Sequence, residues 1–156
     1  MGLQQSIKAE PVSRLPLREA LLVGPETSPR MAVTTMKAKQ LGCVVVVDGG
    51  GKPLGTFTES SLVNLLASDP GVLDHRTVAD FLDPKWAVVR QTAPVLEVLK
   101  AMHEQDVRFV VVTDGEGRAV ALTGQKGMME YIAEHYPQQV MVQRVGSKPT
   151  SEREGA

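Results

Sequence analysis

The chain has 156 residues, of which 42% are hydrophobic and 22% charged, so it is long and apolar enough to bury a core and is not a disordered protein. Seventeen basic residues against eighteen acidic ones give a net charge of −1, which argues against a protein whose main task is to bind nucleic acid. The single cysteine, Cys43, excludes an internal disulfide and a cysteine-based zinc cluster.

Residues 1–11 contain no apolar stretch of the kind that forms the centre of a signal peptide. No apolar run in the chain approaches the roughly 18 residues that a membrane span requires. We therefore expect a flexible N-terminal segment over 1–11, no membrane span and a cytoplasmic location.

From residue 12 onward the chain repeats itself. In each copy a short apolar strand leads into a Thr-x-Pro sequence, an apolar helical pattern ends at a methionine, and a β-branched run closes on an aspartate. The interval from Met36 to Met102 equals the interval between the aspartates that close the valine runs, Asp48 and Asp114. The final short strands end at Thr58 and Thr123, whose interval is shorter by one, so we expect the second glycine-bearing turn to be shorter as well.

Each copy therefore predicts the order strand, helix, strand, turn, strand, helix. The first helix is expected to begin at Ser28-Pro29, because serine is a good N-cap and proline suits the first helical position. The valine runs at 44–47 and 110–112 are continuous, which is typical of strands that are covered on both faces. The closing helices are predicted over 59–68 and 125–135.

The remaining segments complete the predicted organisation. The first repeat occupies 12–68, a linker 69–76 and the second repeat 77–136, which opens on a short helical turn. Weak alternation at 137–146 predicts an added edge strand, and the polar stretch 147–156 predicts a disordered tail.

The repeated pattern resembles the tandem CBS-domain pair called the Bateman module, over about residues 12–136. The resemblance is carried by Thr-x-Pro, a helix to methionine, a valine strand to aspartate, a glycine turn, and then Gly55-Thr56-Phe57-Thr58 in the first copy and Val120-Ala121-Leu122-Thr123 in the second. It implies an α/β (α+β) fold of two βαββα repeats packed sheet to sheet with pseudo-two-fold symmetry. It also implies two clefts between the repeats and frequent pairing of modules into a homodimer.

Many such modules bind AMP, ATP or S-adenosylmethionine through the signature Gly-h-x-(Thr/Ser)-x-x-Asp, whose Asp holds the ribose hydroxyls. This sequence departs from that signature, because the third residue after Thr58 is Ser61 and the third after Thr123 is Lys126. The resemblance nevertheless implies candidate ligand-binding residues in both copies: Gly55, Thr58, Ser60, Ser61, Arg108, Thr123, Gly124 and Lys126.

Each candidate also has a purely structural interpretation. Thr58 can serve as a helix N-cap, Lys126 can be a solvated surface lysine, and Arg108 can pair with Asp106 or a helix carboxylate instead of a phosphate. Trp86 can stack on a base, although packing against Leu82 or Pro84 is the favoured expectation. The three histidines have no metal-ligand spacing, and no catalytic set is present, so we expect neither a metal site nor an enzyme.

Two functions compete at this point. The first is a stand-alone regulatory module that senses a small ligand, an adenine nucleotide (AMP, ADP, ATP), S-adenosylmethionine or another phosphate-bearing molecule, and modulates an unknown partner protein, with no cofactor required. The second is an interaction and dimerisation module whose degenerate clefts bind nothing. In the first case, restoring the signature carboxylate with Ser61→Asp is expected to tighten AMP binding about tenfold.

We expect a homodimer, because the first helix of each repeat carries apolar residues on the side that faces away from the sheet of the other repeat, and a large exposed apolar surface usually marks an interface. These residues are Met31, Val33, Met36, Val95, Val98 and Met102.

Overall fold

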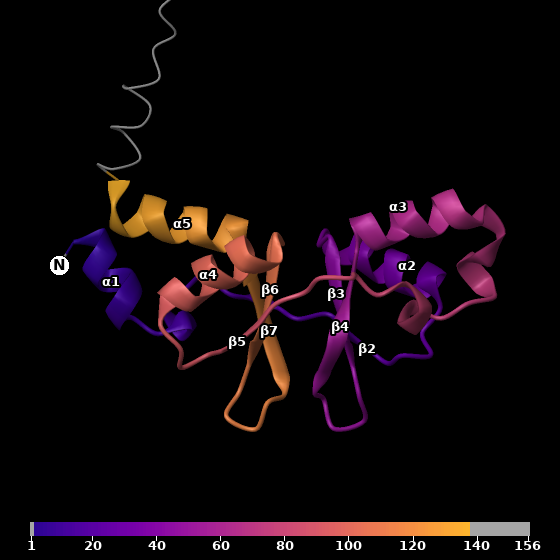
Figure 1. Cartoon of the computed structure of the whole chain (residues 1–156), viewed down its shortest axis with the longest axis horizontal. Coiled ribbons are helices and arrows are strands. Elements are labelled where there is room, and N and C mark those ends of the chain that lie inside the picture. The colour runs from indigo at the N-terminus through magenta and orange to yellow at the C-terminus, as the bar shows by residue number, and fades with distance from the viewer. Residues whose placement is uncertain (1, 138–156) are drawn as a thin grey trace, which may run out of the picture.

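The computed structural model of the chain describes residues 2–137 and consists of two α/β halves that lie side by side, with their sheets facing each other (Figure 1). The first half holds strands β2 (Leu22–Val23), β3 (Cys43–Val47) and β4 (Pro53–Thr58) in the order β2-β3-β4, with helices α2 (Pro29–Lys39) and α3 (Glu59–Ser68). Most of the predicted strand at 137–146 and all of the predicted tail at 147–156 lie outside the described residues.

The second half repeats this arrangement with strands β5 (Val88–Arg90), β6 (Phe109–Thr113) and β7 (Ala119–Gly124) and helices α4 (Val95–Gln105) and α5 (Gln125–His135). In both halves the first strand runs parallel to the valine strand, and the valine strand runs antiparallel to the last one. Short 3₁₀ helices occur at Val12–Arg14, Pro70–Asp74 and Val78–Phe81. The predicted fold class and the order of the elements are thus confirmed.

The two valine strands form the centre of the molecule. Val44, Val45 and Val46 are fully buried, as are Val110, Val111 and Val112, which agrees with the expectation from their unbroken apolar runs. One face of each strand packs under the helices of its own half. The other face contributes to a cluster between the sheets, formed by Ala20, Cys43, Val45, Val111, Ala119 and Leu122.

The halves are joined by an exchange of their leading segments. Strand β1 (Arg18–Glu19) precedes the first half but pairs antiparallel with β7, so it completes the sheet of the second half. The segment that leads into the second half lies along the first, because the Asp83 N–H donates to the Thr56 carbonyl at 2.9 Å and the Val78 N–H to the Thr27 carbonyl at 2.8 Å. Each cleft between the halves therefore draws residues from both.

The segment predicted to be flexible, 1–11, contains a helix in the structure. Helix α1 (Leu3–Ala9) lies against α4 and α5 at the outer side of the second half (Figure 1). The Tyr131 hydroxyl donates to the Glu10 carboxylate, and the Tyr136 hydroxyl to Ser6 Oγ. Leu3 and Ile7 pack against the hydrophobic core of the second half, and this burial offsets the entropy lost on ordering the helix.

The dimer surface inferred from the sequence is wrong in most of its residues. Val95 and Val98 are fully buried and Met36 is 6% exposed, because these side chains form the cores beneath α2 and α4. Of the six residues only Met31 is fully on the surface. The large apolar side chains exposed on the closing helices are instead Val63, Leu66 and Met129.

Candidate functional site

Two clefts open between the halves, one at the start of each closing helix. We call the cleft beside α3 the first cleft and the cleft beside α5 the second cleft. The first has a cavity of about 240 Å³ and the second about 270 Å³. Helices α3 and α5 both begin near the middle of the molecule and run outward, so the two clefts are related by the pseudo-symmetry of the repeat (Figure 1).

The strand register corrects the sequence alignment of the two copies by one position. Cys43 pairs with Thr58 in the first sheet, and Phe109 pairs with Gly124 in the second. The glycines at positive φ in the two turns, Gly51 and Gly117, keep the same interval as the aspartates that precede them, so the second turn is not shorter. The counterpart of Thr58 is therefore Gly124, which is also the N-cap of α5.

This shift changes which residues stand at the positions of the signature. The counterpart of Ser61 is Gly127 and not Lys126, while Lys126 corresponds to Ser60. Thr123 corresponds to Phe57, a core residue beneath the helix. Neither helix therefore carries a carboxylate at its third position.

The first cleft nevertheless contains a carboxylate, which comes from the segment between the repeats. Asp83 Oδ1 accepts hydrogen bonds from the hydroxyls of Ser61 at 2.6 Å and Thr58 at 2.9 Å, and Oδ2 accepts one from the Thr56 hydroxyl at 2.8 Å. The side chains of Thr56, Thr58, Ser61 and Asp83 thus form one connected group at the start of α3, which we call the Asp83 cluster.

The backbone of both segments positions this cluster. Ser61 Oγ accepts the Thr58 N–H at 3.0 Å, which fixes the first turn of α3 in the manner of a capping box. The Asp83 N–H donates to the Thr56 carbonyl, and Leu82 packs on Gly55, where a Cβ would lie 3.0 Å from Leu82 Cδ1. Gly55 therefore permits the close approach that brings Asp83 to the helix.

The second cleft has no such cluster. At the positions of Thr56, Thr58 and Ser61 it carries Leu122, Gly124 and Gly127, none of which has a hydroxyl. Gly124 is required by packing, because a Cβ there would lie 1.9 Å from the Arg108 carbonyl oxygen. The start of α5 is consequently lined by backbone, and a ligand can approach it closely.

The charges around the second cleft are mainly positive. Arg18, Arg108 and Lys126 line it, against a single carboxylate, Glu59. Arg18 is 4.0 Å from Glu130, and within residues 2–137 neither Arg108 nor Lys126 makes an ion pair. Within these residues Arg108 therefore does not form the ion pair with Asp106 or a helix carboxylate that was the structural alternative.

Thr123 also lines the second cleft, and its environment is unusual. The residue is 5% exposed, and its Oγ1 is the one buried side-chain oxygen or nitrogen in the described part of the chain that has no hydrogen-bond partner. A Cβ on Gly127 would lie 2.6 Å from this hydroxyl, so the glycine leaves the space in which it sits. A buried hydroxyl without a partner costs about 1–3 kcal/mol, which a bound polar group can recover.

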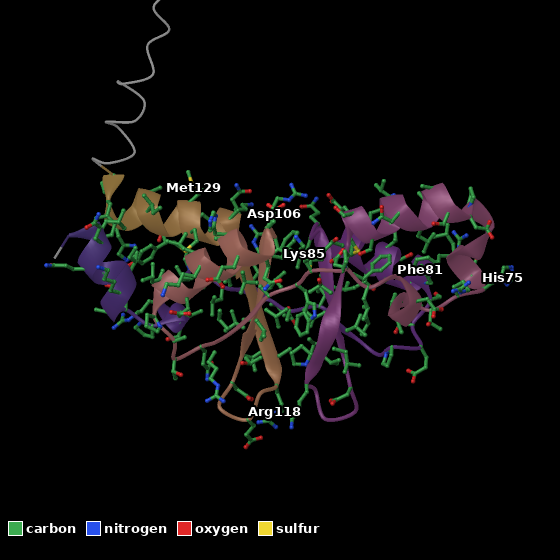
Figure 2. The ribbon with its side chains drawn as sticks, viewed as in Figure 1. His75, Phe81, Lys85, Asp106, Arg118 and Met129 are labelled. Carbon is green, nitrogen blue, oxygen red and sulfur yellow. The ribbon has the colours of Figure 1, made fainter. Side chains whose placement is uncertain are left out.

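Three of the predicted residues line the first cleft, together with several that the sequence did not single out. Thr58, Ser60 and Arg108 line it together with Trp86 and Phe109. Trp86 packs against the cluster between the sheets rather than in the core that holds Leu82. Figure 2 places two further lining residues, Lys85 and Asp106, between the halves at the end where the closing helices begin. Asp83 is the main residue that sequence reasoning missed.

Nothing in the described residues forms a nucleophilic or metal centre. Burial raises the pKa of the Cys43 thiol, and the Asp83 carboxylate raises it further, so the sulfur stays protonated. Residues 2–137 contain no group of three or more His, Cys, Asp or Glu side chains that could hold a metal ion. Among the helices of these residues, none is long and apolar enough to cross a membrane.

The repeat, the exchanged leading segments and the paired clefts define a class of protein, and comparison with known families identifies it. The profile of the CBS domain matches the chain twice, over residues 12–68 and 78–134. The chain therefore belongs to the CBS-domain family and contains a tandem pair.

Solved structures agree with this assignment. The CBS-domain-containing protein ATU1752 from Agrobacterium tumefaciens is 25% identical, with a TM-score of 0.63 over 73% of this chain and 89% of that one. An uncharacterized conserved protein from Pyrococcus horikoshii is also 25% identical, with a TM-score of 0.67 over 80% of this chain and 92% of that one.

More distant structures share the fold. The CBS-domain pair of protein MJ0100, solved with 5-methylthioadenosine and S-adenosyl-L-methionine, has a TM-score of 0.69 at 17% identity over 80% of this chain and 96% of that one.

A curated relative, the uncharacterized protein MK0525 of Methanopyrus kandleri, is 22% identical over 72% of this chain, and the match spans 58% of the relative's length.

Proposed function

We propose that this CBS pair is a regulatory module that binds a phosphate-bearing ligand, most readily an adenine nucleotide, in the second cleft and modulates a partner protein. The observation that carries the proposal is the positive lining of that cleft, with Arg18, Arg108 and Lys126 gathered around the open start of α5. A helix N-terminus and basic side chains both favour an anion. The unpaired Thr123 hydroxyl supplies a further polar contact.

The ligand class is supported by relatives of the same fold. One was solved with 5-methylthioadenosine and S-adenosyl-L-methionine, and another, the protein CBSX2, with AMP. Adenosine-containing compounds are therefore the first to test. With this ligand the module would act through its partner and need no cofactor or catalytic group of its own.

The direct test is calorimetry of the protein with AMP, ADP, ATP and S-adenosylmethionine. We expect at least one of these to bind, and Lys126→Gln to weaken the binding of AMP about tenfold, because a charge-assisted hydrogen bond contributes about 1.5–3 kcal/mol. Lys85→Gln is the matched control, since it removes the same charge from the first cleft. If none of the four compounds binds at millimolar concentration, the proposal fails.

We propose that the module also forms a two-fold symmetric homodimer. Val63 on α3 and Met129 on α5 are 64% and 55% exposed, and both helices lie along the same side of the molecule (Figure 1). A second copy of the chain can cover both helices by one symmetric contact. This surface replaces the one inferred from the sequence.

The alternative function, an interaction module without a ligand, is favoured by a different observation. The Asp83 cluster satisfies the hydroxyls at the start of α3 internally, so the first cleft needs no ligand. If both clefts bind nothing, surface contacts alone would carry the function.

A further inference from the structure

The two clefts differ most at the start of the closing helix. In the first cleft, three hydroxyls from Thr56, Thr58 and Ser61 converge on one point, and the Asp83 carboxylate occupies it. In the second cleft the corresponding residues are Leu122, Gly124 and Gly127. The counterpart of Asp83, at the interval of the repeat, is Leu17, so the carboxylate is missing as well. The three hydroxyls and the carboxylate that they bind are thus present together in the first cleft, and their counterparts in the second cleft lack both groups.

The bonding of Asp83 indicates what this carboxylate does. An ionised carboxylate accepts about four hydrogen bonds, and Asp83 already accepts three from side chains of its own protein. No basic side chain within residues 2–137 forms an ion pair with it. Its partners are hydroxyls, two of them from Thr58 and Ser61 at the N-terminal end of α3, where the helix dipole would otherwise favour an anionic ligand.

We infer that Asp83 is an internal anion that closes the start of α3 to anionic ligands and confines them to the second cleft. The module then binds one such ligand per chain, although its repeat provides two clefts. This inference rests on the proposed function of the second cleft, but the behaviour of the first cleft can be tested separately.

Trp86 makes the test specific. It is the only tryptophan in the chain, it lines the first cleft, and it does not line the second. Its fluorescence therefore reports on the first cleft, while calorimetry counts all bound ligand. The probes are AMP and inorganic pyrophosphate.

For the wild-type protein we expect one AMP per chain and little change in Trp86 fluorescence. Asp83→Asn keeps the shape of the side chain and one acceptor oxygen but removes the charge. This variant is expected to bind a second AMP, and its Trp86 fluorescence should change on titration with either probe. The change should persist in Asp83→Asn/Lys126→Gln, in which the second cleft is weakened.

Asp106→Asn is the matched control. Asp106 also lines the first cleft, so the substitution removes the same charge, but Asp106 makes no hydrogen bond to the hydroxyls of the cluster. It lies in the left-handed region at φ 52°, which asparagine tolerates well, so the variant should fold. We expect it to behave like the wild type.

The outcomes separate the two proposals. If wild type binds no AMP but Asp83→Asn binds pyrophosphate with a Trp86 signal, the proposed function fails and the role of Asp83 stands. If wild type binds two AMP per chain, or folded Asp83→Asn still binds one with no Trp86 signal, the inference is wrong. Loss of a Trp86 response to AMP on Asp83→Asn would also overturn it, since Asp83 would then bind the ribose.

Discussion

A single side chain, Ser61, shows how a substitution in a binding signature can be misinterpreted. In the sequence alone, Ser61 stands where the signature has a carboxylate, which predicts that Ser61→Asp tightens AMP binding. In the structure Ser61 Oγ lies 2.6 Å from Asp83 Oδ1, so a carboxylate from another segment already stands beside this position. The substitution would bring two carboxylates together in a partly buried place.

We now expect Ser61→Asp to destabilise the protein. Ser61→Ala loses a hydrogen bond to a charged group, and Ser61→Asp should cost about 1–3 kcal/mol more because it adds like-charge repulsion. Urea denaturation of the two variants measures the difference. Adding Asp83→Asn should remove most of the excess cost of Ser61→Asp, and an excess that persists in the double variant would contradict this account.

Sequence reasoning can single out candidate site residues that lie close together in the chain, but not those that come from a distant segment. Thr58, Ser60 and Ser61 lie close together at the end of β4 and the start of α3, so a local sequence pattern can single them out as candidates. Asp83 was missed because it is 22 residues beyond Ser61 and reaches the helix only through the exchange of leading segments. The error of one position between Thr58 and Thr123 arose because two identical residues were aligned, whereas the turn glycines keep the true interval of the repeat.

At the scale of elements, the helices were predicted more reliably than the terminal segment. The closing helices begin and end at the predicted residues, and Ser28 caps α2 by accepting the Met31 N–H at 3.2 Å. Helix α1 was missed because its seven residues have little tendency to be helical alone, and its stability comes from α4 and α5. Tertiary contacts of this kind leave no local pattern.

The contact between Tyr131 and Glu10 should contribute to the attachment of the N-terminal segment. Tyr131→Phe leaves the Glu10 carboxylate without this donor, so we expect a loss of about 1.5–3 kcal/mol of unfolding free energy. Tyr136→Phe breaks a bond between two neutral hydroxyls and should cost only about 1 kcal/mol. Denaturant unfolding compares them.

The same contact predicts a pH dependence. Burial and the Glu10 carboxylate raise the pKa of Tyr131 above its ordinary value of about 10. A raised pKa in the folded state stabilises the protein fully below about pH 10, and this contribution is lost as the pH rises through the folded value. Tyr131→Phe should therefore weaken the alkaline loss of stability, and an unchanged alkaline profile would contradict the assignment.

For the whole molecule, the arrangement of the closing helices predicts its oligomeric state. The exposed side chains of Val63 and Met129 should be covered by a second copy, so the protein is expected to sediment as a dimer at micromolar concentration. Val63→Glu should give a monomer of 16.8 kDa with little change in the stability of the chain itself.

Val120→Glu is the control for the dimer. Val120 is 44% exposed but lies on β7 rather than on a closing helix, so the same substitution there should leave the dimer intact. A wild-type protein that sediments as a monomer would rule out the dimer. Dissociation by Val120→Glu alone would place the interface elsewhere.

The exchange of leading segments also affects how the chain folds during synthesis. Strand β1 pairs with β7, which the ribosome makes only after the whole first half, and the partners of Glu10 and Ser6, Tyr131 and Tyr136, follow later still. Contacts between such distant residues form slowly, because a long loop must close first. The segment that holds β1 must therefore wait without its strand partner until β7 has been made, and during that interval it is exposed to chaperones, proteases and modifying enzymes from which the finished fold protects it.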